Sequence, residues 1–192
     1  MTKSFQVVGI GNAIIDILAY VSDDFLVKNE IKKGVMNLIN SKRSNELFKK
    51  ISITKKVAGG SAANTIVGLS QLGIKTSYFG KVSNDEFGKF FTDDLNSNNI
   101  EFDVSEKFDS SNLSTGHCIV LVTPDGERTM NTYLGVTEFL SKDDLNLNIL
   151  QNCSWLYLEG YRYDGMDSQK AFEIAINYSK KGGGKVALSL SD

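Results

Sequence analysis

The sequence predicts an α/β fold in which a parallel sheet is flanked by helices and carries a small β-sheet lid. Strand-like and helix-like segments alternate near both ends of the 192-residue chain. Such alternation is typical of a parallel sheet with helices on its faces. In the middle of the chain, two β-rich segments flank Pro124-Asp125-Gly126, a turn typical of a hairpin. We therefore expect one α/β domain with a lid built around this hairpin.

The first half of the chain has clear start and stop signals. Apolar residues recur at helical spacing in two segments, and the second of these segments stops at Gly73, a common residue after a helix. In chain order we expect a strand at Phe5–Ile10, helices at Ser41–Ile51 and Asn64–Leu72, a strand at Thr76–Gly80, and a helix after a capping box at Ser83–Glu86.

The second half begins with the hairpin and then returns to alternation. We expect hairpin strands at His117–Thr123 and Thr129–Leu134 with Val35–Asn40 as a companion, a helix from Ser141, a strand at Trp155–Glu159, a helix at Asp167–Lys181 and a strand at Lys185–Leu190. The lid segments are then about residues 17–40 and 101–136. No helix follows the last strand to cover it, so we expect residues 1–192 to be the N-terminal portion of a longer domain, apparently truncated.

The composition excludes several classes of protein. With 41% hydrophobic and 23% charged residues, the chain can bury a core and is not a disordered segment. A net charge of −2 without long runs of one sign does not favour nucleic acid or an anionic membrane. The apolar run Ala13–Val21 is interrupted by Asp16 and is too short for a membrane span. We expect a cytoplasmic protein whose partners are small molecules, with no nucleic acid and no membrane.

Polar and glycine-bearing segments follow the predicted strands. Ligands gather at the carboxyl ends of the strands in a parallel α/β sheet, so these segments form the site hypothesis. They are Asp16, the loop Ala58–Asn64, Asn84-Asp85, Glu159–Tyr161 and Asp192.

Asp16 is the first candidate because its neighbours, including Ile15 and Ile17, are apolar. A carboxylate in such surroundings costs free energy unless hydrogen-bond donors satisfy it. Two neighbouring hydroxyls of a sugar could each donate to one of its oxygens. An ion pair, or an exposed aspartate at the end of a strand, would explain the same residue, and these alternatives stay open.

The Gly59-Gly60 loop leads directly into a predicted helix. Glycines let the backbone approach a ligand closely, and the start of a helix presents free N–H groups. Asn64 could offer a donor and an acceptor to a polyol. A tight turn in which Asn64 or Ser61 simply caps the helix is the alternative.

Arg128 follows the hairpin turn beside Glu127. A guanidinium group suits phosphate oxygens, so Arg128 could clamp an anion from the lid. The alternative is a solvated arginine paired with a neighbour, which is favoured on local grounds.

Three other signals do not carry a function. The segment Gly9–Ile14 begins like a dinucleotide-binding fingerprint but has Ile14 where a glycine belongs, which disfavours an NAD-dependent enzyme. Gly182–Lys185 is no phosphate-binding loop, because it ends a helix and lacks a following Ser or Thr. His117, the one histidine, is expected on a lid strand and has no metal-ligand partners at useful spacing, so we expect no metal site.

Several of these segments together resemble the PfkB (ribokinase-like) family of carbohydrate and nucleoside kinases, most closely its adenosine-kinase-like branch. Ala58–Thr65 is similar to the first family signature. The other matching segments occur in the family's order and are Val8–Ile17, Asn84–Gly88, Gly126–Met130 and Tyr157–Tyr161.

The resemblance implies a Rossmann-like parallel sheet with a lid, and transfer of phosphate from ATP, with Mg²⁺, to a hydroxymethyl group of a sugar or nucleoside. It implies that Asp16 binds the vicinal sugar hydroxyls. Gly60 and Asn64 would complete that grip, and Gly59 would allow close approach of the backbone. Arg128 would bind the transferring phosphate. For a nucleoside substrate, the residues near the base would be Met36, Leu38, Met130 and Tyr161. Some family members dimerise through the lid sheet, so a homodimer stays open.

One family motif is absent. The second signature, Gly-Ala-Gly-Asp, carries the catalytic base of the family and does not occur in these 192 residues. We therefore assign no catalytic residue, and we expect this chain alone to be inactive while carrying the substrate half-site. A non-catalytic sugar- or nucleoside-binding module, or an inactive fragment, is the alternative.

Overall fold

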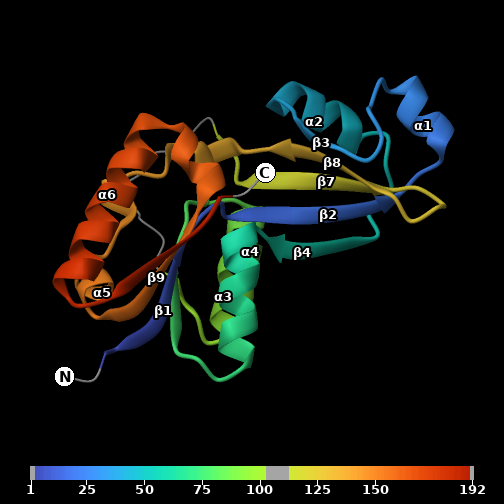
Figure 1. The fold of residues 1–192 in the computed structure, drawn as a ribbon. Helices are drawn as coiled ribbons and strands as arrows, with labels where there is room; N and C mark the ends of the chain where they lie inside the picture. Colours follow the sequence, from blue (N-terminus) through green and yellow to red (C-terminus); the bar gives the residue numbers. More distant parts are fainter. Residues whose placement is uncertain (1–2, 103–112, 191–192) are drawn as a thin grey trace.

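The computed structural model describes residues 3–102 and 113–190, whose strands form two five-stranded sheets (Figure 1). The first sheet is parallel throughout and has the order β10-β9-β1-β5-β6. Its strands are β1 (Phe5–Ile10), β5 (Thr76–Phe79), β6 (Glu101–Phe102), β9 (Cys153–Glu159) and β10 (Lys185–Ser189). This arrangement confirms the predicted α/β fold with a parallel sheet.

The second sheet projects from one end of the first and has the order β3-β8-β7-β2-β4 (Figure 1). Its strands are β2 (Ile14–Tyr20), β3 (Met36–Leu38), β4 (Lys55–Gly59), β7 (Gly116–Val122) and β8 (Arg128–Tyr133). The pairs β2–β7 and β3–β8 are parallel, and the other two pairs are antiparallel.

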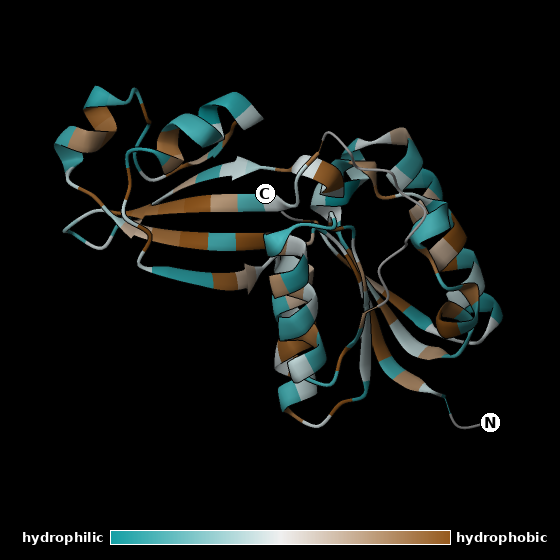
Figure 2. Ribbon diagram, turned by 180° about the vertical axis from the view of Figure 1, so that it is seen from behind, coloured by the Kyte–Doolittle hydropathy of each residue, from teal (hydrophilic) through white to brown (hydrophobic). Residues whose placement is uncertain are grey.

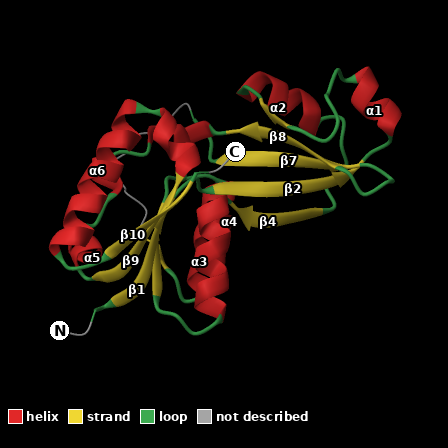
Figure 3. Ribbon diagram, viewed as in Figure 1, coloured by secondary structure: helices red, strands yellow, loops and turns green. Residues whose placement is uncertain are grey.

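Helices cover both faces of the first sheet and one face of the second (Figure 3). The helices are α1 (Asp23–Lys28), α2 (Ser41–Phe48), α3 (Ser61–Gln71), α4 (Glu86–Ser97), α5 (Leu147–Gln151) and α6 (Met166–Lys181). Helices α3 and α4 lie on one face of the first sheet, α5 and α6 on the other, and α1 and α2 over the second sheet. No helix in the described ranges is long and apolar enough to cross a membrane.

Strand β2 shows how the second sheet is built. Ile15, Ile17 and Ala19 are fully buried in the apolar clusters on the helix side. Ile14, Asp16 and Leu18 alternate with them and are half-buried on the opposite side. Brown apolar residues run along β2 and β7 in Figure 2. We call the side that carries Asp16 the open face of the second sheet.

The structure corrects the predicted place of Asp16. It does not follow the first strand but lies in the middle of β2, because the chain enters a new strand three residues after β1. The lid sheet is also larger than the predicted antiparallel hairpin with one companion. The first two residues of the predicted loop Ala58–Asn64 end the edge strand β4 (Lys55–Gly59), which is antiparallel to β2 and was not predicted.

Two helix predictions also need correction. The helix expected from Ser141 is a 3-10 turn, Lys142–Asp144, followed by the separate helix α5, whose N-cap is Asn146. The capping box expected at Ser83–Glu86 is wrong, because Asp85 is the N-cap of α4 and accepts a hydrogen bond from Gly88 N.

The expected lid segments, 17–40 and 101–136, match the second sheet only in part. The sheet also contains β4, outside both ranges, whereas β6 at 101–102 belongs to the first sheet. Residues 103–112 lie outside the described residues.

Candidate substrate-binding site

Asp16 and Gly59 lie side by side on neighbouring strands. A Cβ atom added at Gly59 would lie 2.7 Å from the carboxyl carbon of Asp16. The carboxylate therefore occupies the space that any side chain at position 59 would need. This close approach explains why glycine ends β4 at this point.

The Asp16 carboxylate is half-buried and accepts no hydrogen bond from the described residues. Burial raises its pKa, and the positive charge of Arg128 partly offsets that rise. Arg128 itself is exposed at the start of β8. The site thus presents a partly desolvated acceptor with one cation within electrostatic reach.

A row of side chains extends from Asp16 across the open face. Asp16 pairs with Cys118, Cys118 with Thr132, and Thr132 with Leu38. Paired residues on adjacent strands point to the same side of a sheet, so these four share the open face. Burial raises the pKa of the Cys118 thiol to about 11, which keeps that thiol neutral.

Apolar residues line the neighbouring row. Leu18 pairs with Val120, Val120 with Met130, and Met130 with Met36. Met36 and Leu38 are 44% and 64% exposed. A cavity of about 250 Å³ borders Leu38 and Thr132 at the end of the Asp16 row. The open face therefore combines one carboxylate with an apolar strip.

Helix α3 begins beside this face. Gly60 is its N-cap and has φ 104°, a conformation that favours glycine, and no side chain caps the helix. The alternative in which Asn64 or Ser61 caps α3 is therefore wrong. Asn64 lies exposed in the first turn. Its amide is free of capping and available to a ligand.

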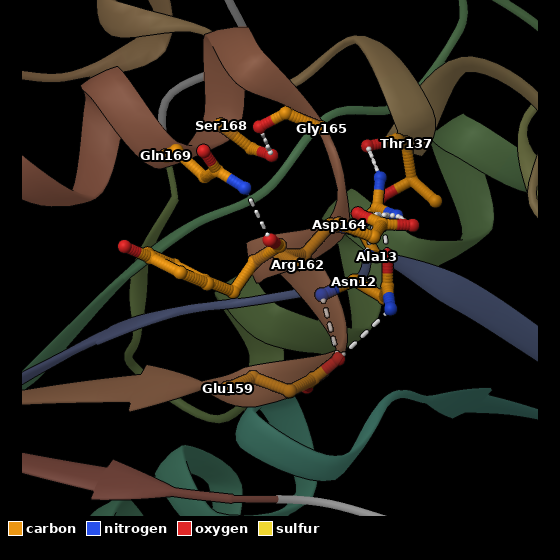
Figure 4. Close-up of polar contacts among 10 residues, drawn as sticks. Asn12, Ala13, Thr137, Glu159, Arg162, Asp164, Gly165, Ser168 and Gln169 are labelled. Atoms are coloured by element: carbon orange, nitrogen blue, oxygen red, sulfur yellow. Dashed lines mark hydrogen bonds and ion pairs between the residues drawn. The ribbon is translucent and has the colours of Figure 1, made fainter.

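A buried glutamate supports the start of α3 instead. Glu159, at the end of β9, is fully buried and accepts a hydrogen bond of 2.7 Å from Ala62 N. Its other oxygen accepts bonds from Asn12 N at 3.2 Å and Asn12 Nδ2 at 2.9 Å (Figure 4). Burial raises the pKa of Glu159, and these donors oppose the rise.

The structure brings most of the candidate residues together, with one exception. Asp16, Gly59, Met36, Leu38, Met130 and Arg128 belong to the second sheet, and Gly60 and Asn64 start α3 next to it. Tyr161 lies apart from them in the short helix Gly160–Asp164, which follows β9 of the first sheet. It is 39% exposed.

Sequence reasoning missed Asn12 and the role of Glu159. Asn12 lies in the segment set aside as a broken dinucleotide fingerprint, and its place directly after the first strand was the available signal. His117 lies on β7, as predicted. It is buried, and its Nε2 forms a hydrogen bond of 2.6 Å with Ser44 Oγ. Across the described ranges, no group of three or more His, Cys, Asp or Glu side chains could hold a metal ion.

The chain is similar in sequence to known sugar and nucleoside kinases. The family model described as pfkB family carbohydrate kinase matches residues 7–192. The 5-dehydro-2-deoxygluconokinase of Clostridium botulinum (strain Alaska E43 / Type E3) is 32% identical over 130 residues, which cover 66% of this chain and 38% of the relative. Adenosine kinase 2 of Arabidopsis thaliana is 27% identical over 163 residues, 80% of this chain and 46% of the relative.

Solved structures give the same result. The adenosine kinase from Sinorhizobium meliloti matches 98% of this chain and 57% of its own, with 38% identity and a TM-score of 0.88. The probable sugar kinase from Rhizobium etli CFN 42 matches all of this chain and 57% of its own, with 33% identity and a TM-score of 0.90. The chain thus spans under half the length of those curated relatives and just over half of those solved chains. It belongs to the pfkB family of carbohydrate kinases.

Proposed function

We propose that the open face of the second sheet and the start of α3 form the substrate half-site of a kinase that phosphorylates a hydroxymethyl group of a sugar or nucleoside. The observation that carries the proposal is the Asp16 carboxylate, half-buried beside Gly59 without a hydrogen bond from the described residues. A desolvated acceptor of this kind is stabilised by ligand hydroxyls.

The chemistry of the half-site follows from its groups. The two oxygens of Asp16 accept one hydrogen bond each from two vicinal hydroxyls. The absence of a side chain at Gly59 leaves the Asp16 carboxylate free to hold this position. Asn64, exposed in the first turn of α3, offers an amide to a further hydroxyl, and Gly60 lets the helix begin close to the ligand.

The apolar strip favours a nucleoside over a free sugar. Met36, Leu38 and Met130 present exposed or half-buried apolar surface next to the Asp16 row, suited to the face of a base. Tyr161, in the short helix that follows β9, is the one base-contact candidate that lies apart from this strip. The similarity to an adenosine kinase at 38% identity supports this choice, and the similarity to 5-dehydro-2-deoxygluconokinase supports a sugar.

The phosphoryl donor is proposed to be ATP with Mg²⁺, as in pfkB kinases. ATP supplies the phosphoryl group, and Arg128 is the cation that the half-site offers to phosphate oxygens. Among the described residues, no group of three or more His, Cys, Asp or Glu side chains could hold Mg²⁺.

We further propose that these 192 residues bind substrate but do not transfer phosphate by themselves. The Gly-Ala-Gly-Asp segment that supplies the base in the family is not among them. A non-catalytic binding module, the alternative function, would also bind substrate without transferring phosphate. Dimerisation through the exposed edge of the second sheet is tested by the molar mass in light scattering.

Calorimetric titration of the purified chain with adenosine, ribose and fructose tests the half-site. We expect saturable binding of at least one of these, strongest for adenosine. Asp16→Asn should weaken that binding by about tenfold to a hundredfold, because hydrogen bonds to a charged acceptor contribute about 1.5–3 kcal/mol. Asp167→Asn, in the first turn of α6, is the matched control and should bind like the wild type.

Equal affinity of the Asp16→Asn variant and the wild type would contradict the role of Asp16. Phosphate transfer from ATP by the 192-residue chain, above a mock-purified control, would contradict its proposed lack of catalysis.

A further inference from the structure

The chain passes between the two sheets four times. Among the described residues, it leaves β1 for β2 at residues 11–13 and β4 for α3 at Gly60. It enters β7 at residues 113–115, and it leaves β8 for the first-sheet half at residues 134–137. We call the described residues of these four crossings the neck. The two halves are also joined by a shared apolar core, in which Ile15, Ile17 and Ala58 of the second sheet pack with residues of α3 and α4.

The crossings pack backbone against backbone. A side chain at Gly60 would overlap the carbonyl oxygen of Asn12, so the first and second crossings touch. A side chain at Gly135 would overlap the carbonyl oxygen of Ser114, so the third and fourth crossings touch as well. The neck is therefore closely packed, and its hydrogen bonds act on its geometry together with the shared apolar core.

One buried side chain binds two crossings directly. Glu159 accepts bonds from Asn12 N and Nδ2 on the first crossing, and from Ala62 N just after the second. The partners are 147 and 97 residues away in the sequence. A side chain at Gly11 would collide with the same carboxylate, which shows how closely the chain wraps around it.

A relay extends these contacts to the fourth crossing (Figure 4). Thr137 Oγ1 donates to Asn12 Oδ1 at 3.3 Å and accepts from Ala13 N at 3.2 Å. Arg162, also buried, donates from Nη1 to Thr137 O at 3.0 Å. The third crossing is held separately, by Asp85, which accepts a bond of 2.8 Å from Thr115 N.

The chemistry of Glu159 suits this task. A buried carboxylate is costly without donors, so its three N–H bonds are strongly interdependent. Its negative charge also lies at the positive start of α3. Loss of any crossing from this arrangement leaves buried polar groups unpaired, which favours a single arrangement of the two sheets.

We propose that Glu159 is a positioning residue that, together with the shared apolar core, sets the angle between the two sheets, and so holds Asp16 and Gly59 in place relative to Asn64 and the start of α3. The angle is a property of the chain itself. Its consequence for affinity rests on the proposed function.

Spin labels on the two halves measure the angle without any ligand. Val27 on α1 and Leu72 at the end of α3 are 76% and 80% exposed, and the native Cys118 and Cys153 are buried. Cysteine substitutions at Val27 and Leu72, labelled and measured by pulsed electron paramagnetic resonance, report the distance distribution between the halves.

Two variants loosen the neck in different ways. Glu159→Gln keeps the shape of the side chain, but its NH₂ group must replace one of the two oxygens that accept N–H bonds, so at least one of these bonds is lost. Thr137→Val keeps the volume but removes the relay, and it decides the question if Glu159→Gln does not fold. The matched control is Asp144→Asn, a buried carboxylate that accepts bonds from Lys81 Nζ at 2.8 Å and Ser141 N at 2.7 Å and none from a residue of the neck.

We expect a wider or shifted distance distribution in Glu159→Gln and Thr137→Val but not in Asp144→Asn. We also expect adenosine to bind the two neck variants about tenfold more weakly, because only a fraction of molecules keeps the competent angle. Distributions that coincide with the wild type, or an equal change in Asp144→Asn, would overturn the inference. A changed distribution with unchanged affinity would overturn the link to Asp16. A wild-type chain that binds no adenosine would contradict the proposed nucleoside site and leave the distance result standing.

Discussion

The carboxylate of Asp16 fills the space beside Gly59 that a side chain would occupy, at 2.7 Å from an added Cβ. Two strands far apart in the sequence thus share one small volume at the open face. Any methyl group at position 59 must displace the end of the Asp16 side chain, which can swing away without moving the backbone. A substitution at position 59 can therefore change ligand binding without unfolding the chain.

Gly59→Ala should weaken adenosine binding by about tenfold or more while the chain stays folded. The methyl group pushes the carboxylate out of the position in which it accepts two hydroxyls, and each such bond contributes about 1.5–3 kcal/mol. Calorimetry gives the affinity and circular dichroism the fold. Wild-type affinity in a folded Gly59→Ala protein would refute the assignment.

Gly68→Ala serves as the control on the neighbouring helix. Gly68 lies within α3, and a Cβ there would meet nothing within 4 Å. Alanine in a helix interior is favoured over glycine by about 0.5–1 kcal/mol. We expect a higher melting temperature and unchanged adenosine affinity; a loss of stability would show that the surroundings of α3 are wrongly described.

As the pH is lowered, adenosine affinity should begin to fall at a higher pH than it would if Asp16 had the pKa of an ordinary aspartate. Burial raises the pKa of Asp16 above 3.8, so protons compete with the ligand at a higher pH. Titrations between about pH 7.5 and pH 4.5 should show weaker binding toward acid in the wild type. The Asp16→Asn variant lacks the titrating group and should lack this slope. Parallel slopes in both proteins would rule out Asp16 as the titrating acceptor.

The stability of the second sheet should depend on pH through His117. Burial lowers the pKa of His117 below 6.5 in the folded state, so the unfolded chain binds the proton more readily. The stability that the neutral ring contributes is therefore present above pH 6.5 and decreases as the pH falls below that value.

Urea unfolding of the wild type and of His117→Gln isolates this contribution. The wild type should lose more free energy of unfolding than the variant between about pH 7.5 and pH 5.5. The difference between the two proteins cancels the contribution of the carboxylates, including Asp16 and Glu159, whose raised pKa values act in the opposite direction. An identical loss in both would show that His117 does not titrate differently on folding.

Tyr78→Phe should lower the free energy of unfolding by about 1–2 kcal/mol. The hydroxyl of Tyr78, which is fully buried, donates to Asn12 O at 2.9 Å, and phenylalanine leaves that carbonyl without the donor. Tyr20→Phe, at a side chain 70% exposed, should change nothing. Equal stability of Tyr78→Phe and the wild type would mean that the hydrogen bond from Tyr78 to Asn12 O makes no net contribution to the free energy of unfolding.

Local signals were sufficient for four of the five strands of the first sheet and for most helices, but not for the two-residue strand β6 or for α1. The glycine after α3 and the apolar spacing of α6 can be recognised without tertiary context, because capping and periodicity act within a few residues. Asp16 was harder to place. Apolar residues lie on both sides of β2, so Ile14 and Leu18 on the open face hide the alternation with buried Ile15 and Ile17.

The neck could not be predicted from the sequence for a different reason. The donors of Glu159 come from residues 97 and 147 positions away, and nothing in the local sequence around Glu159 indicates them. The packing of Gly60 against Asn12 also appears only when the two crossings meet. Position and chemistry alone indicate Asp16, Gly59 and Asn64 as candidates, and the resemblance to a family, whose pattern already contains such long-range information, adds their specific roles.

Calorimetric comparison of adenosine with its 2′-deoxy and 3′-deoxy analogues tests the central claim most directly, because each analogue removes one of the two hydroxyls assigned to Asp16. The account predicts that the chain binds adenosine, that each analogue binds about tenfold to a hundredfold more weakly, and that Asp16→Asn removes most of this discrimination. Equal affinity for adenosine and both analogues would contradict the claim that the Asp16 carboxylate holds a vicinal diol.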